Sequence, residues 1–209
     1  MGGPKEQTVI AGDTAPGLDE QQSAARFDAR ARRRLRTIAS ASIACGLDSG
    51  KPRLPAVEPL PPLLSAPGAS FVTLRRRDGT LRGCIGRLEA YRPLAIDVAD
   101  NAFGAAFRDT RFQPLTPAEW IDCTVKIAVL GVPQPMDASD EQALLERLEP
   151  GRDGLILEDG GRRGTFLPGV WDQVGGPRAF VHQLKRKIGW SADHWSPTMQ
   201  AWRYTVESF

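Results

Sequence analysis

A cysteine set between two glycines is the residue best placed to do chemistry in this sequence. It lies in the segment Leu81-Arg82-Gly83-Cys84-Ile85-Gly86. Glycines on either side allow the backbone to bend there, or to be approached closely by another group. A strand end of this kind can present a thiol at a cleft and leave backbone N–H groups available for an anion.

Positive charge is concentrated around this cysteine. Six arginines lie from Arg75 to Arg92, against only Asp78 and Glu89. Nearby arginines favour the thiolate, which is the nucleophilic and metal-binding form of cysteine. The opposing interpretation is a packing role, because free cysteine is among the most buried residue types. Both interpretations of Cys84 remain open at this point.

Metal and cofactor chemistry have no support in the sequence. The two histidines, His182 and His194, lie about a hundred residues beyond Cys84, and neither HxxxH nor CxxC spacing occurs. The motifs GxxxxGK[ST] and GxGxxG, which bind phosphates and dinucleotides, are also missing. An odd number of cysteines without paired spacing fits neither a disulfide framework nor a zinc site. We therefore predict no metal and no cofactor.

Three further motifs place charged or hydroxyl groups where a predicted strand or helix ends. They are Arg108-Asp109-x-Arg111, Asp153-Gly154 and Arg163-Gly164-Thr165. Element ends are where scaffolds present functional groups. The alternative is local, because a helix dipole favours arginine at a C-terminus and a hairpin strand can simply pack its threonine in the core.

These motifs and the cysteine segment are expected to converge on one anion-binding cleft. Cys84 would form its floor and is the candidate catalytic residue, while Arg82 and Arg108 would supply positive potential. The predicted cleft residues are Arg82, Gly83, Gly86, Arg108, Asp109, Arg111, Arg163 and Thr165.

Hydrophobic periodicity and turn residues predict the elements that position these groups. Helices are expected over 19–47, 93–107, 139–148 and 177–188, and a capping box is expected at Thr116–Glu119. Two hairpins are expected, the first with a two-residue turn at Asp78-Gly79 and the second over 155–167. Single strands are expected over 123–129 and 201–209. Hairpins outnumber crossover units, which predicts an α+β fold with a mixed, mainly antiparallel sheet flanked by helices.

Three segments have a composition of their own. Residues 1–18 are expected to be a flexible tail, which leaves one domain over 19–209. Six arginines from Arg26 to Arg36 can contact nucleic acid or form a solvated helix face. Six prolines from Pro52 to Pro67 make an extended connector, which can be a peptide-groove ligand or a loop wrapping the domain.

Composition places the chain among globular proteins. Its 209 residues carry 27 Lys+Arg against 25 Asp+Glu, and 41% are apolar. No apolar run is long enough for a membrane span, and the first residues lack a signal-peptide pattern. These features predict a cytoplasmic protein with no membrane association.

Four motifs taken together resemble the AMMECR1 family, in particular its prokaryotic branch, the AmmeMemoRadiSam system protein A. They are LRGCIG at 81–86, AFRDxRF at 106–112, DGLIL at 153–157 and RGTFLP at 163–168. The resemblance runs from about residue 20 to the last residue. It implies an α+β fold with a larger and a smaller subdomain and a cleft near LRGCIG. It also implies a Memo-like protein and a radical SAM enzyme as partners.

Three functions follow as hypotheses. The first is a protein that works with those two partners and binds a substrate or partner through the LRGCIG cleft. The second is a transferase or modification enzyme in which Cys84 is the nucleophile and arginines bind an anionic small molecule. The third is an RNA-binding protein using Arg26–Arg36 and Arg75–Arg77. A near-neutral net charge and an aromatic content of 7% count against this third hypothesis.

Overall fold

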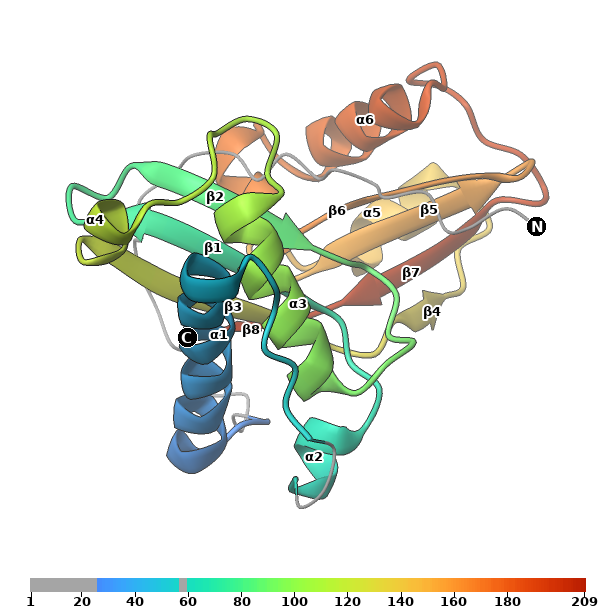
Figure 1. Cartoon of the computed structure of the whole chain (residues 1–209). Helices are drawn as coiled ribbons and strands as arrows, with labels where there is room; N and C mark the ends of the chain where they lie inside the picture. The colour runs from blue at the N-terminus through green and yellow to red at the C-terminus, as the bar shows by residue number, and fades with distance from the viewer. Residues whose placement is uncertain (1–25, 57–59) are drawn as a thin grey trace. The chain divides into compact units, whose positions relative to one another are not determined.

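Two compact units, each with its own sheet and core, make up the chain in the computed structural model, which describes residues 26–56 and 60–209 (Figure 1). Unit 1 runs up to Leu130 and includes Glu207–Phe209, and unit 2 is Gly131–Val206. The α+β class is confirmed, although the strands are divided between two four-stranded sheets. The tail predicted over residues 1–18 lies outside the described residues.

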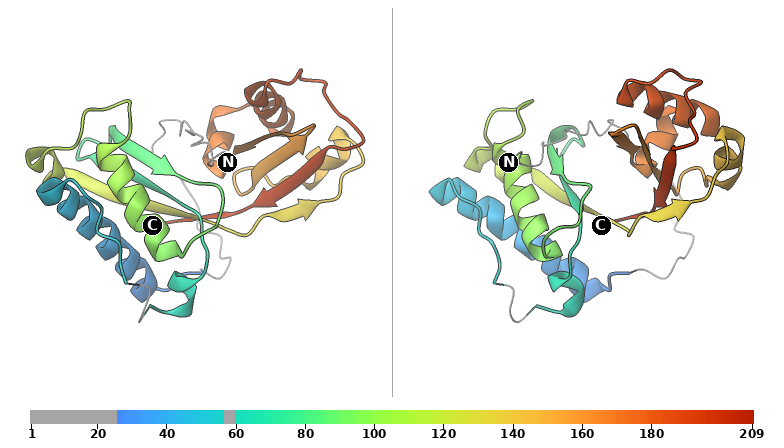
Figure 2. Two further views of the ribbon diagram at one scale, coloured as in Figure 1. Left: turned by 45° about the vertical axis from the view of Figure 1, so that its right-hand side comes forward. Right: turned by 90° about the vertical axis from the view of Figure 1, so that its right-hand side faces the viewer.

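Unit 1 is a sheet with helices packed on one face. The strand order is β2-β1-β3-β8, with β1 (Ser70–Arg76), β2 (Leu81–Gly86), β3 (Cys123–Leu130) and β8 (Val206–Ser208). The helices are α1 (Ala29–Ser49), α2 (Pro62–Ser65), α3 (Leu94–Phe107) and α4 (Pro117–Trp120). α1 and α3 lie side by side over the same face of the sheet (Figure 2).

The core of unit 1 lies between this face and the two helices. Val72, Leu74 and Ile127 point from the sheet into it and are fully buried. The helix predicted over 93–107 is confirmed as α3, and its Leu94 and Val98 are fully buried against these residues. Alternation along β1 and β3 therefore directs the intervening residues to the opposite face of the sheet.

Helix α1 is shorter at its start than the predicted helix over 19–47. It begins at Ala29 because Asp28 caps it, its carboxylate accepting the Ala31 N–H at 2.7 Å. Positions 26–28 are therefore not helical, and 19–25 lie outside the described residues. The helix continues two residues past its predicted end at 47, to Ser49, where Gly50 follows in the left-handed region at φ +69°.

Replacing Asp28 with alanine is expected to lower the free energy of unfolding by about 1 kcal/mol, the usual value of an N-cap side chain. Urea unfolding followed by circular dichroism measures the change. Asp48→Ala is the matched control, because this exposed carboxylate lies in the last turn, where the helix dipole disfavours it. A loss with Asp48→Ala equal to that with Asp28→Ala would contradict the capping role.

The hairpin of β1 and β2 has the predicted strands but a different turn. The Gly79 N–H donates to the Arg76 carbonyl at 2.9 Å, and Gly79 has φ +84°. A register shift follows between Leu74 and Arg75. This combination is a three-residue loop with a bulge, so the predicted two-residue turn is wrong. Beyond the bulge the register places Thr73 opposite Cys84.

A buried carboxylate ties α3 to the start of β1. Asp97 accepts the Ser70 N–H at 2.9 Å and the Ser70 hydroxyl at 2.7 Å. Asn101 and Arg92 also donate to it, at 2.8 and 3.0 Å. Burial raises the pKa of Asp97, and these hydrogen bonds oppose that effect. The network fixes the helix that carries Arg108 relative to the sheet that carries Cys84.

Unit 2 has a second sheet, ordered β4-β7-β5-β6. Its strands are β4 (Gln134–Met136), β5 (Gly154–Asp159), β6 (Arg162–Phe166) and β7 (Gln200–Tyr204), and its helices are α5 (Glu141–Arg147), the 3-10 helix η1 (Pro168–Gln173) and α6 (Pro177–Ile188). The predicted second hairpin and the helix over 177–188 are confirmed. The core includes stacked rings of Trp171 and Phe180, with centroids 3.8 Å apart.

The strand predicted over 201–209 is two strands that belong to different sheets. β7 pairs with β4 and β5 in unit 2, whereas β8 pairs with β3 in unit 1. The break falls at Thr205, whose carbonyl accepts the Gly131 N–H at 2.8 Å. None of the helices in the described ranges combines the length and the apolar character that a membrane span requires.

Candidate functional site

The thiol of Cys84 is held in a defined position on β2. Its Sγ lies 3.1 Å from Thr73 Oγ1, because the strand register sets the two residues opposite each other. Cys84 is 4% exposed, and Thr73 is half-buried. The sulfur is therefore nearly covered, and the threonine hydroxyl is its polar neighbour.

Burial raises the pKa of the Cys84 thiol, and this effect outweighs all the others. The hydrogen bond with Thr73 and the charges of Arg111 and Arg75 act in the opposite direction, while Asp109 adds to the rise. The arginines thus favour the thiolate, as expected, but less than desolvation disfavours it. Burial therefore favours the protonated thiol.

Cys84 is therefore expected to react with iodoacetamide about tenfold more slowly than Cys45 at pH 7.5, because only the thiolate is the nucleophile. Cys45 is partly exposed on α1 and serves as the internal reference. Peptide-resolved mass spectrometry measures both rates in one sample, and denatured protein shows the rates without burial. A rate for Cys84 at pH 6.5 above those of Cys45 and Cys123 would reveal an activated thiolate.

Asp109 and Arg111 close the outer edge of β2 beside this cysteine. Asp109 accepts the Cys84 N–H at 2.8 Å, and Arg111 donates to the Cys84 carbonyl at 3.4 Å. Arg111 also donates hydrogen bonds from two nitrogens to the two oxygens of the Asp109 carboxylate, at 2.9 and 2.7 Å. Burial would raise the pKa of Asp109, but these hydrogen bonds outweigh burial and lower it. The pair replaces the neighbouring strand that β2 lacks.

Arg82 forms a buried ion pair instead of facing solvent. Its side chain is 2% exposed and donates to both oxygens of Glu119, at 2.8 and 3.0 Å, and to the Gln113 carbonyl at 2.9 Å. Hydrogen bonding to Arg82 lowers the pKa of Glu119 to about 2. The same Glu119 completes the predicted capping box with Thr116, which is confirmed. The charge of Arg82 is therefore already neutralised.

Arg108 follows the last turn of α3 and reaches back along the helix. It pairs with Asp100 and lies over the Phe103 ring, with its guanidinium carbon 5.0 Å from the ring centroid. The Asp100 carboxylate also forms ion pairs with Arg92 at 3.0 Å and with Arg87 at 3.6 Å. Three arginines thus share one carboxylate, and the side chain of Arg108 remains 48% exposed.

The two glycines of the cysteine segment make room for packing. A Cβ on Gly83 would lie 2.0 Å from the Ala105 carbonyl oxygen, and one on Gly86 would lie 2.2 Å from the Phe71 ring. The glycines were predicted to allow another group to approach the backbone closely. In the structure these groups are the Ala105 carbonyl of α3 and the Phe71 ring of β1. The small residues of α3 have the same cause, because Gly104 lies against Ile85.

The remaining predicted residues lie in unit 2. The Thr165 hydroxyl is buried between the Leu155 carbonyl, at 2.7 Å, and the Tyr204 hydroxyl, at 2.8 Å. Arg163 is exposed and pairs with Glu158 at 3.6 Å. Asp153 is buried and accepts the indole N–H of Trp171 on its carbonyl at 2.6 Å. Each has local partners within unit 2.

Contacts in the structure therefore join Cys84, Asp109 and Arg111, whereas Arg82 and Arg108 pair with two other carboxylates, Glu119 and Asp100. The convergence of the motifs of both units on one cleft stays a prediction. Sequence reasoning missed three functional partners: Thr73, Glu119 and Asp100. The hairpin register could have identified Thr73 as the neighbour of Cys84. The capping box could have drawn attention to the Glu119 carboxylate. Across the described ranges, no three His, Cys, Asp or Glu side chains gather as metal ligands.

Fold and site together define a two-unit α+β protein with a glycine-flanked cysteine on a strand whose edge is closed by an Asp–Arg pair. The AMMECR1 family model matches residues 36–209, and the chain belongs to the AMMECR1 family. A protein of Thermotoga maritima is 36% identical over 142 residues, which is 67% of this chain and 76% of the relative. A protein of Methanopyrus kandleri is 32% identical over 182 residues, covering 82% and 84%.

A solved structure has the same fold. The crystal structure of an uncharacterized protein from Pyrococcus horikoshii matches with a TM-score of 0.70 and 29% sequence identity. The match covers 83% of this chain and 88% of that one. The family and the two-sheet architecture are thus supported by sequence and by structure.

Proposed function

We propose that this chain is a binding protein that acts with a Memo-like protein and a radical SAM enzyme. The observation that supports a binding role is Cys84, which is covered and hydrogen-bonded to Thr73, whereas the partnership follows from the resemblance to the AmmeMemoRadiSam system protein A. Nucleophilic catalysis needs the thiolate, which a neighbouring base or a lowered pKa supplies, and burial raises the pKa of this thiol. Within the described residues, His182 contacts Glu141 and His194 contacts Asp159, and neither contacts the cysteine.

The proposed binding surface is the face of the unit 1 sheet that carries Cys84. Strand pairing places Thr73 and Lys126 on this face beside Cys84, and Thr124, two pairs further along, lies on the same face. It is opposite the face that α1 and α3 cover (Figure 2). Lys126 and Thr124 are exposed, and Arg111 is 30% exposed at the edge beside Cys84. Hydroxyls and cations together suit an anionic group on a substrate or on a partner.

Co-purification from the native host tests this proposal. Tagged wild-type protein is expected to recover the Memo-like protein and the radical SAM enzyme under conditions that preserve weak complexes. Lys126→Glu should reduce recovery at least fivefold, because it reverses a charge at the centre of the surface. Cys84→Ser should retain recovery, because the proposed binding forms no covalent bond with the thiol.

Arg33→Glu on α1 is the matched control, because it reverses the same charge at an exposed position away from this face. Loss of recovery with this variant equal to that with Lys126→Glu would argue against the Cys84 face. Failure to recover either partner with the wild type would contradict the partnership itself.

A further inference from the structure

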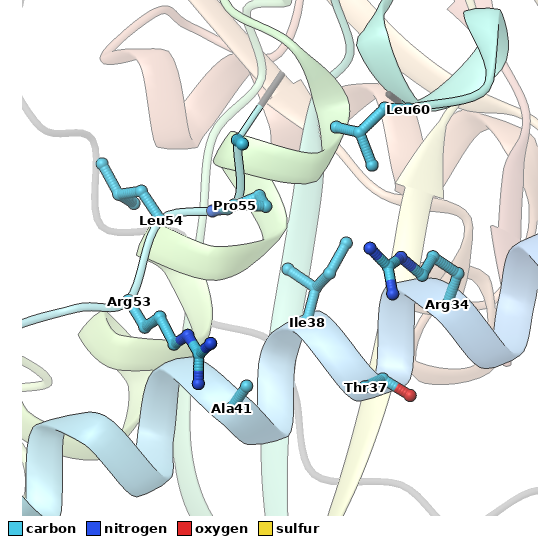
Figure 3. A pocket seen from close by; sticks show the side chains of 9 residues that line it. Arg34, Thr37, Ile38, Ala41, Arg53, Leu54, Pro55 and Leu60 are labelled. Carbon is cyan, nitrogen blue, oxygen red and sulfur yellow. The ribbon is translucent and has the colours of Figure 1, made fainter. Parts of the chain in front are cut away.

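Two motifs that the proposed function does not use meet in one groove. The arginine-rich part of α1 forms one side, and the proline-rich connector over 53–56, together with Leu60, forms the other (Figure 3). The groove has a volume of about 400 Å³, which falls within the size range of small-molecule sites. It lies outside the Cys84 face, because α1 covers the opposite face of the sheet.

The arginines of α1 divide into two groups by their partners. Arg32 pairs with Glu207 at 3.0 Å, and Arg32 and Arg36 both lie over the Phe209 ring. Arg34 points into the groove instead, as does Arg53 from the connector (Figure 3). No carboxylate of the described residues contacts either of these two guanidinium groups. Within the described residues, both charges are left for a ligand, and Glu58 of the connector lies outside those residues.

The space between the two cations is mainly apolar, with Thr37 as its one uncharged polar residue. Ile38 and Ala41 form its floor, and Pro55 and Leu60 form its wall. Figure 3 shows Arg34 and Arg53 at opposite ends, with Arg53 near Ala41. Arg34 and Ala41 are two helical turns apart, which corresponds to about 10 Å along the axis. The groove thus presents a cation at each end of an apolar centre.

We propose that this groove binds an organic dianion whose two carboxylates are separated by an apolar chain. Each guanidinium can form charge-assisted hydrogen bonds with one carboxylate, and the chain between them can cover Ile38 and Ala41. A single small inorganic anion does not span the two ends of the groove, about 10 Å apart along the helix axis, and a neutral chain gives neither guanidinium a countercharge. Recognition therefore favours one negative charge at each end of an apolar chain.

Isothermal titration of the full chain with three probes of one length tests this proposal. Octanedioate, octanoate and 1,8-octanediol share a chain of eight carbons and carry two, one and no charges. Octanedioate is expected to bind about tenfold more tightly than octanoate, and octanediol more weakly still, because each charge-assisted contact contributes separately. Butanedioate carries two charges on a shorter chain and is expected to bind no better than octanoate.

Variants locate the site. Arg34→Gln or Arg53→Gln is expected to reduce the affinity for octanedioate about tenfold, to that of octanoate with the wild type. Arg33→Gln, the matched control at an exposed arginine outside the groove, should change it less than twofold. Ala41→Leu should weaken every probe by filling the centre. Circular dichroism checks each fold, and glutamine has a helix propensity close to that of arginine.

Several results would overturn the proposal. Equal affinity for octanedioate and octanoate would show that the second charge is not recognised. Equal losses with Arg33→Gln and Arg34→Gln would show attraction to the helix as a whole. Absence of binding by octanedioate at millimolar concentration would remove the site.

Discussion

Replacing Glu119 with glutamine is expected to lower the free energy of unfolding by about 3 kcal/mol, the lower end of the cost of breaking a buried ion pair. The variant leaves the guanidinium of Arg82 without a countercharge although its side chain is 2% exposed. The lower end applies because a third of the Glu119 side chain is exposed, so water screens the pair from that side. Urea unfolding at pH 7 measures the change.

Removing both charges is expected to restore part of this loss. In Arg82→Met no buried charge is left, so the double variant Arg82→Met with Glu119→Gln should be more stable than Glu119→Gln alone. A double variant less stable than Glu119→Gln would show that the arginine has a further role. A loss below about 1 kcal/mol in Glu119→Gln would place the pair among ordinary surface pairs.

The pH dependence of stability gives a second measurement of the same pair. The pKa of Glu119 is lowered to about 2 in the folded protein, from an ordinary value of 4.5. Its contribution is therefore fully present above pH 4.5 and is lost as the pH falls towards 2. Glu119→Gln should show a shallower loss of stability over this range than the wild type.

Gly83→Ala is expected to lower the free energy of unfolding by about 3 kcal/mol, at the upper end of the cost of overpacking. The new methyl group would lie 2.0 Å from the Ala105 carbonyl oxygen, so the backbone of α3 must move away from β2. No side-chain rotation can relieve the contact, because both partners are fixed by the main chain.

Gly175→Ala is the matched control for this prediction. A methyl group there meets nothing within 4 Å, and its φ is not in the left-handed region. Its effect should be within about 0.5 kcal/mol of zero. Thermal and urea unfolding of both variants test the difference. If Gly83→Ala is as stable as Gly175→Ala, the close packing of α3 on β2 is not needed for the fold.

Local patterns predicted the hairpin of unit 1 well. The mainly apolar residues 71–74 and the Asp78-Gly79 pair indicated a strand on each side of the turn. The register places Thr73 opposite Cys84. The loop has one more residue than predicted, but the bulge restores the pairing that a two-residue turn would give. Turn residues and alternation act over short distances, so sequence alone was enough here.

Charge partners and burial were not predictable in the same way. Arg82 pairs with Glu119, which is 37 positions away, and not with the nearer Asp78 or Glu89. The ion-pair partner of a long side chain depends on which carboxylates the tertiary structure places within its reach. For Cys84, counting nearby arginines predicted the direction of their own effect but not desolvation, which depends on tertiary packing and dominates the pKa.

The single residue between β7 and β8 has a consequence for biosynthesis. Unit 1 obtains its fourth strand from Val206–Ser208, which the ribosome adds only after all of unit 2. Until then Ile127 of β3 lacks the two main-chain hydrogen bonds that it makes with Phe209, at 2.8 and 2.9 Å. An open strand edge is a template for pairing with other chains. The nascent protein therefore carries an exposed edge through the whole synthesis of unit 2, and premature release would leave unit 1, the earlier-made part, as the unfinished one.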